Sequence, residues 1–176
     1  MIRELLKKIV RFKRSEDGSL TVEFVLIFPA YLFFIMGAVE YSMVTIQQSL
    51  LERSMDIVVR DIRLGTDAVI THDTIKDDIC SRAGIIPSCS KNLRLEMILQ
   101  DAFTGLDFPV EPDCVNREEE AKPARNFEAG ASNALMILRA CAKVDPIFPT
   151  TAMGRALQSD DGLVTLTSIT AFVQEP

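Results

Sequence analysis

The chain has 176 residues, of which 48% are apolar and 25% charged, and its formal net charge is −6. This length accommodates one ordinary domain in addition to an anchoring segment. The acidic balance argues against a nucleic-acid-binding protein, because neutralising phosphates requires clustered Lys and Arg side chains.

Residues 1–17 form a basic segment ahead of an acidic remainder. They contain six basic and three acidic side chains, whereas the part after Glu40 contains 13 basic and 20 acidic ones. Apolar residues recur at helical spacing in the segment, as in helices that lie on anionic lipid. The positive-inside bias then predicts a cytoplasmic N-terminus and export of the residues after about 46, in a protein with a single membrane span and an extracytoplasmic C-terminal part.

The stretch from residue 18 to residue 44 is the candidate membrane helix. Residues 24–39 contain no charged side chain, and the apolar character extends from Leu20 to Ile46. A bilayer core of about 30 Å requires roughly 20 mainly apolar residues. The run is longer than a secretory signal core, and Glu40-Tyr41 makes a poor cleavage site, so removal of the whole helix is not expected. Pro29 is expected to bend the helix.

The helical pattern continues past the membrane without a break. A helix over residues 20–64 would be about 65 Å long, with Gly65 as its C-terminal cap. Its second half is amphipathic, which predicts that it packs on a globular head. The expected apolar stripe consists of Ile46, Leu50, Leu51, Ile57, Val58, Ile62 and Leu64, opposite Gln47, Glu52, Arg53, Asp56, Arg60 and Arg63.

The remaining residues predict the elements of that head. Residues 73–83 suit a short helix with Thr71 or Asp73 as its N-cap. Residues 105–130 contain several prolines and the charge run 117–122, which is typical of a long loop. Residues 135–144 have the Ala and Leu content of a helix, but their alternation favours a strand.

Two further segments predict strands. Residues 162–173 are rich in Thr, Ile and Val and are the strongest strand candidate. Residues 92–100 alternate as a half-buried strand does. Its inward set is Leu93, Leu95, Met97 and Leu99, and its outward set is Arg94, Glu96 and Gln100.

These elements predict an α+β chain in three parts. Residues 1–18 form a basic cytoplasmic leader, residues 19–64 a long N-terminal helix that spans the membrane to about residue 46, and residues 65–176 an exported head. In the head, a small antiparallel β-sheet packs on the amphipathic half of the helix.

All four cysteines lie on the predicted exported side. An even count in an oxidising compartment favours two disulfides over free thiols. Three connectivities are possible, and we favour Cys80–Cys89 and Cys114–Cys141 because each closes a modest loop. A zinc site is disfavoured, because the chain has no CxxC and its only histidine, His72, has no neighbouring cysteine.

The sequence offers little support for an enzyme. It contains no glycine-rich phosphate loop, HExxH motif or nucleophile elbow. Asp17-Gly-Ser19-Leu-Thr21 fits a DxSxT adhesion pattern by chance at the membrane boundary, and the acidic run 118–120 is typical of a solvated loop. We therefore expect no catalytic, cofactor-binding or metal site.

Glu23 is the unusual residue of the apolar stretch. A carboxylate costs about 2.5–3.5 kcal/mol at mid-bilayer, and less near the interface. Glu23 either reaches the headgroups or pairs with a cation. The nearest candidate cation is a new amino terminus at Ser19, produced by cleavage after Gly18.

The run Gly18-Ser-Leu-Thr-Val-Glu23-Phe24, followed by an apolar helix with Pro29, resembles class III, type IV-like prepilins. More narrowly, residues 16–42 resemble the TadE/TadF-like minor pseudopilins of the tight-adherence (Flp) pilus system, as does the ending AFVQEP. Phe24 stands where the major pilin usually has Tyr, which fits a pseudopilin better.

This resemblance implies a pilin-like fold and cleavage between Gly18 and Ser19 by a prepilin peptidase. Glu23 would then pair with the amino terminus of a neighbouring subunit. The implied partners are that peptidase, other pilus and pseudopilin subunits, the inner-membrane assembly platform and membrane lipid. The alternative is an unprocessed, single-pass periplasmic protein that binds another envelope component.

Overall fold

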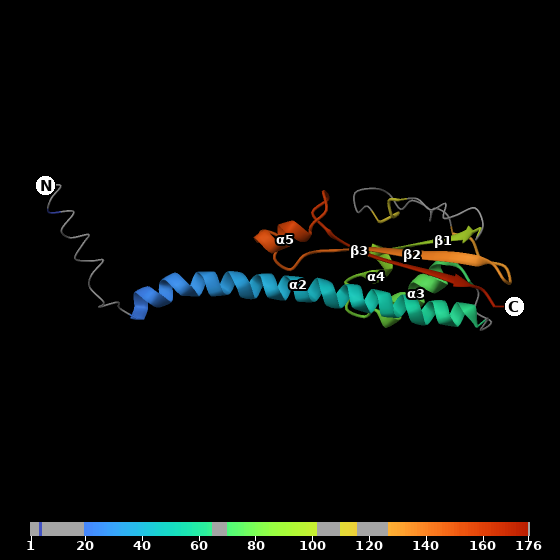
Figure 1. The fold of residues 1–176 in the computed structure, drawn as a ribbon, viewed down its shortest axis with the longest axis horizontal. Coiled ribbons are helices and arrows are strands. Elements are labelled where there is room, and N and C mark those ends of the chain that lie inside the picture. The colour runs from blue at the N-terminus through green and yellow to red at the C-terminus, as the bar shows by residue number, and fades with distance from the viewer. Residues whose placement is uncertain (1–3, 5–19, 65–69, 102–109, 116–126, 176) are drawn as a thin grey trace.

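The computed structural model describes residues 4, 20–64, 70–101, 110–115 and 127–175. One long helix, α2 (Leu20–Arg63), runs along the molecule and carries a small three-stranded sheet against its C-terminal half (Figure 1). The sheet and the short helices form a head along the C-terminal half of α2, and the other half of α2 extends beyond it. The expected α+β architecture is therefore confirmed. The leader, residues 1–18, lies outside the described residues apart from Glu4.

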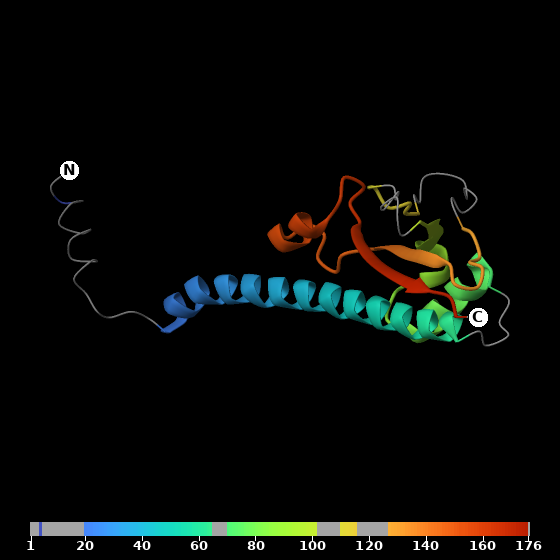
Figure 2. The ribbon, with the colours of Figure 1, turned by 45° about the vertical axis from the view of Figure 1, so that its right-hand side comes forward.

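Helix α2 has 44 residues and ends one residue before its predicted end. It continues through Pro29, and it curves gently along its length without a break (Figure 2). Arg60 and Arg63 lie in its last turn, where positive side chains complement the exposed carbonyl groups of a helix end.

The face of α2 that packs on the head is rotated from the predicted stripe. Gln47, expected on the polar side, is buried, whereas Ile46 and Leu64 are exposed. The buried positions recur at intervals of three and four residues from Gln47 onwards, which defines one helix face. Because Ile46 lies about 100° around the helix from Gln47, it falls outside this face. The buried side chains are Gln47, Leu51, Ser54, Met55, Val58, Val59 and Ile62.

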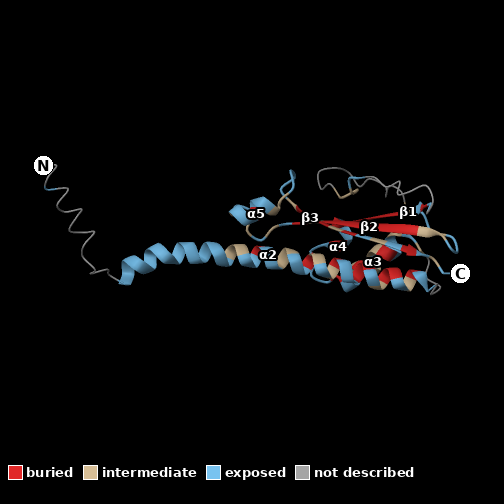
Figure 3. Cartoon of the chain, viewed as in Figure 1, coloured by how far each residue is buried: buried red, intermediate tan, exposed pale blue. Residues whose placement is uncertain are grey.

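The sheet has the order β1-β2-β3, with both pairs antiparallel. Its strands are β1 (Leu93–Gln100), β2 (Leu135–Val144) and β3 (Val164–Val173). The ambiguous segment is thus the central strand, as its alternation predicted, and the register pairs Leu95 with Ala140 and Ala140 with Ser168. Apolar side chains of the sheet form a core shared with α2, and Figure 3 shows in red the buried residues of the strands and of the C-terminal half of α2.

Strand β1 is buried on both faces, so the half-buried prediction is wrong. Arg94, Glu96 and Gln100 were expected in solvent but are at most 9% exposed, whereas Leu99 is 53% exposed. The reason is a polar cluster on the outer face. Glu96 Oε2 accepts a hydrogen bond from Arg139 Nε at 2.6 Å.

Residues 110–115, which belong to the predicted long loop, cover this polar cluster. Glu96 Oε2 also accepts from the Asp113 backbone N–H at 3.1 Å, and Arg139 Nη2 donates to the Glu111 carbonyl at 2.9 Å. Arg94 Nε lies 3.2 Å from Asp113 Oδ2. Charged residues can therefore occupy this face because each charge has a partner. Residues 102–109 and 116–126 lie outside the described residues.

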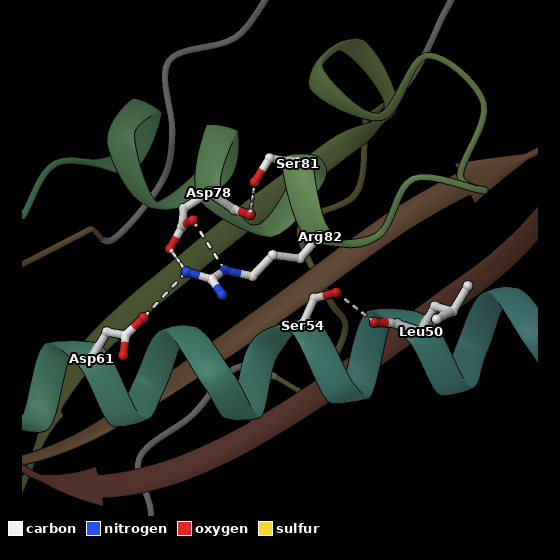
Figure 4. A network of polar contacts seen from close by, with 6 residues as sticks. All are labelled: Leu50, Ser54, Asp61, Asp78, Ser81 and Arg82. Atoms are coloured by element: carbon white, nitrogen blue, oxygen red, sulfur yellow. Dashed lines mark hydrogen bonds and ion pairs between the residues drawn. The ribbon is translucent and has the colours of Figure 1, made fainter.

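Helix α3 (His72–Arg82) confirms the predicted short helix and its cap. Thr71 Oγ1 accepts from the Thr74 backbone N–H, and the Thr71 N–H donates to Thr74 Oγ1, which completes a capping box. At the other end, Arg82 lies between Asp78 and Asp61, and so links α3 to α2 (Figure 4).

Two disulfides join the cysteines in the favoured pairing, Cys80–Cys89 and Cys114–Cys141. The first connects α3 to α4 (Cys89–Asn92), and the second fixes the loop at residues 110–115 to β2. Helices α4 and α5 (Ala152–Leu157) were not predicted. Each has fewer than two turns, which is too short to produce a helical period in the sequence.

Candidate functional site

The structure describes two of the four residues predicted for processing and assembly. Gly18 and Ser19 lie outside the described residues, and α2 begins directly after them at Leu20. Glu23 lies in the first turn of α2 and is exposed. A carboxylate is favourable at a helix N-terminus because the free N–H groups give that end a partial positive charge.

Phe24 belongs to a row of exposed aromatic side chains along the same half of α2. It is 59% exposed, and its ring stacks on that of Phe28 with a centroid distance of 4.8 Å. Further along, the rings of Phe33 and Phe34 meet edge to face. Within this chain, aromatic rings on this half of α2 contact one another and leave much of their surface free.

The N-terminal half of α2 is a continuous apolar surface. The large apolar side chains of residues 20–35 are exposed, as the pale blue half of the helix in Figure 3 shows. Soluble monomers rarely expose an apolar patch above a few hundred Å². The helix is long and apolar enough to be a single membrane span, and none of its most apolar window is buried within the chain.

Glu40 marks the point where α2 meets the head, and the sequence analysis did not identify it as a site. Its side chain is 1% exposed. Its two carboxylate oxygens accept hydrogen bonds from the backbone N–H groups of Ile147, at 3.0 Å, and Phe148, at 2.6 Å. The signal in the sequence was a carboxylate directly at the end of a long uncharged run. We refer to these two hydrogen bonds as the Glu40 clamp.

The loop held by the Glu40 clamp leads into α5. Thr151 caps α5 by accepting from the Gly154 N–H at 3.1 Å. Gly154 is buried, and a Cβ atom there would lie 2.1 Å from the Phe148 carbonyl oxygen. Only glycine fits at this position, so α5 is folded tightly back on the segment that the clamp fixes.

A groove of about 470 Å³ lies between α2 and α5. Gly37 forms part of its floor, and a Cβ atom built there would lie 3.8 Å from Met153 Cβ, an ordinary contact. The walls are almost entirely apolar. The lining residues are Phe33, Phe34, Gly37, Ala38, Tyr41, Thr151, Ala152, Met153 and Ala156.

The titratable groups of the head with shifted pKa values serve local structure. Lys143 in β2 donates a hydrogen bond to Asp161, which lies just before β3. This bond joins the two segments, and it lowers the pKa of Asp161. His72 Nδ1 lies 2.9 Å from Asp73 Oδ1 and lowers the pKa of Asp73. The His72 ring packs edge-on against Phe127.

No group of three or more His, Cys, Asp or Glu residues is placed to hold a metal ion within the part of the chain that the structure describes. Of the two acidic patterns in the sequence, the run 118–120 lies outside that part. So do Asp17 and Ser19 of the DxSxT pattern.

Comparison with known proteins identifies the long helix. Residues 18–60 match the family model described as TadE-like protein, which confirms the resemblance predicted from the sequence. The match covers Glu23, Phe24 and Glu40 and stops three residues before α2 ends. No curated protein and no solved structure matches the chain. The match supports the interpretation that the chain is a component associated with the Tad pilus.

Proposed function

From the TadE-like match of its long helix, we propose that the chain is a minor pseudopilin or assembly component of a Tad (Flp), type IV-like pilus. Helix α2 anchors it as a single span in the inner membrane, with the N-terminus in the cytoplasm and the head on the exported side. The observation that carries this proposal is a TadE-like helix whose first half exposes apolar surface and whose second half is buried by a folded head.

The charges and the cysteines support this orientation. The basic residues 1–17 flank one end of the span, and the excess of acidic residues follows it, as the positive-inside bias requires. Both disulfides lie in the head, and disulfides persist in oxidising compartments such as the periplasm.

Processing would adapt this helix for assembly. A prepilin peptidase removes residues 1–18 by cutting between Gly18 and Ser19, which discards the basic flank and creates a positive amino terminus. The exposed Glu23 then pairs with the amino terminus of a neighbouring subunit, because an unpaired carboxylate among packed apolar helices is strongly unfavourable. Phe24 and its aromatic neighbours supply apolar contact surface. This pairing fixes the register between subunits.

The role is structural rather than catalytic. The apolar half of α2 contacts other pilus or pseudopilin subunits, lipid and the assembly platform, and the acidic head presents a separate surface outside the membrane. Disulfides and the polar cluster around Glu96 and Arg139 keep that head folded. The stiffness of the chain, rather than a reactive group, is what it contributes.

The intact mass of the membrane-extracted protein tests processing. Expressed with its cognate prepilin peptidase, the chain is expected to lose the mass of residues 1–18, and without the peptidase it is expected to keep it. Gly18→Leu should block the loss. Gly37→Ala is the matched glycine control, because a Cβ atom at residue 37 makes only an ordinary contact, and it should be processed normally.

A full-length chain under both conditions would overturn cleavage. The protein would then be a permanent single-span anchor whose head binds another envelope component. Capture of the head by purified envelope proteins would become the informative measurement.

A further inference from the structure

We propose that the segment at residues 146–157, which includes α5, is a second membrane contact. In this arrangement the segment lies in the headgroup region of the exported leaflet, and the groove between α5 and α2 holds a phospholipid acyl chain. The inference rests on the membrane span of the proposed function and adds a lipid-binding surface to it.

The first argument for this proposal is the position of α5 along α2. Residues 20–39 are mainly apolar, with Glu23 as their only charged side chain, and all are exposed except the half-buried Met36 and Gly37. At 1.5 Å per residue they span about 30 Å, the thickness of a bilayer core. The exported boundary of the core therefore falls close to Val39. The α2 side of the groove runs from Phe33 to Tyr41. Helix α5 consequently lies at the depth of this boundary, which Figure 1 shows as its position beside the middle of α2.

The second argument is that the walls of the groove are continuous with the surface of the span. Phe33 and Phe34 line the groove, and both are also exposed members of the span. The groove is thus continuous with the surface that contacts lipid tails. Its apolar lining and open side suit an alkyl chain that enters from the bilayer.

The Glu40 clamp removes the main objection to lipid at this position. A carboxylate at the edge of the core would otherwise face lipid. Instead, Glu40 is 1% exposed and accepts from two backbone N–H groups of the same segment. The clamp therefore places the loop against α2 and covers the charge at once.

The composition of the segment matches a membrane interface. Between residues 146 and 159 the only charged side chain is Arg155, which is exposed, and a basic side chain there favours anionic headgroups. Ile147 and Met153 are exposed apolar side chains. Tyr41, 57% exposed, stands at the boundary, where aromatic residues are enriched in membrane proteins.

Tryptophan fluorescence in vesicles tests the proposal directly, because the chain contains no tryptophan. The full chain is reconstituted in phosphatidylcholine and phosphatidylglycerol vesicles, with or without phosphatidylcholine brominated on its acyl chains. Three single-tryptophan variants are compared. Met153→Trp reports on α5, Phe33→Trp on the span, and Ile169→Trp on the outer face of β3, where Ile169 is 59% exposed.

The proposal predicts blue-shifted emission and bromine quenching for both M153W and F33W. The quenching of M153W should exceed that of I169W by roughly twofold or more, because residue 153 lies at bilayer depth and residue 169 does not. Adding Ala156→Glu, a charge in the groove wall, should reduce the quenching of M153W. Adding Ala156→Leu should not.

Each other outcome is decisive. Quenched F33W with red-shifted, unquenched M153W would show that α5 faces water and would overturn the proposal while keeping the span. Blue-shifted emission of M153W without bromine quenching would show that protein, such as a second copy of this chain, covers the groove. This result would also overturn the proposal. Unquenched F33W would show that the span itself is outside lipid, and the proposed function would fail with it.

Discussion

At the scale of single residues, the charges that matter are the buried ones. Glu40 and the pair Glu96–Arg139 are almost fully enclosed. Glu40 accepts from two backbone N–H groups, whereas Glu96 and Arg139 bind each other and backbone groups. Enclosed charges are tolerated only with such partners. Their substitution should therefore have effects that exposed charges do not show.

Glu40→Ala should release the loop at residues 147–148 from α2. The change leaves two backbone N–H groups without their acceptor, and hydrogen bonds to charged groups contribute about 1.5–3 kcal/mol each. Hydrogen exchange at the Ile147 and Phe148 amides should accelerate. Glu52→Ala, at an exposed position on the same helix, is the control. Equal protection in both variants would show that the clamp does not hold the loop.

Arg139→Met should destabilise the head by about 3–5 kcal/mol, because it leaves Glu96 buried without its cation. Urea unfolding of the purified chain measures the loss. Arg63→Met is the matched control. Arg63 pairs with Glu175, but both side chains are about half exposed, and such surface pairs contribute about 0–1 kcal/mol. A similar midpoint for both variants would contradict the buried role of Arg139.

At the scale of elements, short connections hold the strands in register. The turn before β3 is fastened to β2 by Lys143 and Asp161, and Ser159 N–H donates to the Leu163 carbonyl at 2.8 Å. The hydrogen bond from Lys143 lowers the pKa of Asp161. This connection is therefore sensitive to acid.

Asp161→Asn should make the free energy of unfolding fall less steeply as the pH is lowered. The pKa of Asp161 is lower in the folded chain than its ordinary value of 3.8, so the unfolded chain takes up the proton first. The stabilisation is present above pH of about 4 and disappears as pH falls through the lowered pKa. Urea midpoints from pH 6 to pH 2 measure the slope. An unchanged slope, with Asp160→Asn as control, would contradict the coupling.

The elements also show what the sequence could predict. Helix α2, the cap of α3 and strands β2 and β3 follow from local patterns, and the central strand was identified by alternation alone. The burial of Arg94 and Glu96 was not predictable, because it depends on a loop outside the strand, in which Asp113 contacts both residues. The rotated face of α2 was also not predictable, because the pattern of an amphipathic helix defines its buried face only to within about one residue.

The candidate site divides in the same way. Gly18, Glu23 and Phe24 form a compact motif that the sequence reveals. The Glu40 clamp and the groove join residues more than 100 positions apart, and the partners on the distant side are backbone N–H groups, which carry no sequence signal. The two disulfides were favoured because their loops are short, a local criterion.

At the scale of the whole molecule, the two disulfides contribute to the stability of the head. They close separations of 9 and 27 residues. Restricting the unfolded chain contributes about 2–4 kcal/mol for a typical disulfide, and more for a longer loop. The Cys114–Cys141 bond also holds the loop that covers Glu96.

Replacing both Cys114 and Cys141 with Ser should lower the free energy of unfolding more than replacing both Cys80 and Cys89. The difference in loop closure alone is about 1 kcal/mol, and loss of the cover over Glu96 adds to it. Urea unfolding of both double variants provides the comparison. An equal or reversed order would show that the loop at residues 110–115 is held without the disulfide.

Helix α2 is unbroken from Leu20 to Arg63, including at Pro29, and the Glu40 clamp joins it to the head midway along its length. It therefore forms a rigid connection, with no hinge, between the bilayer and the sheet. An axial pull on the head displaces the first turn by an equal distance, and each 1.5 Å of travel lifts about one residue out of the lipid. Glu23, in the first turn at the far end of this helix, therefore leaves the lipid only after the rest of the apolar half has done so.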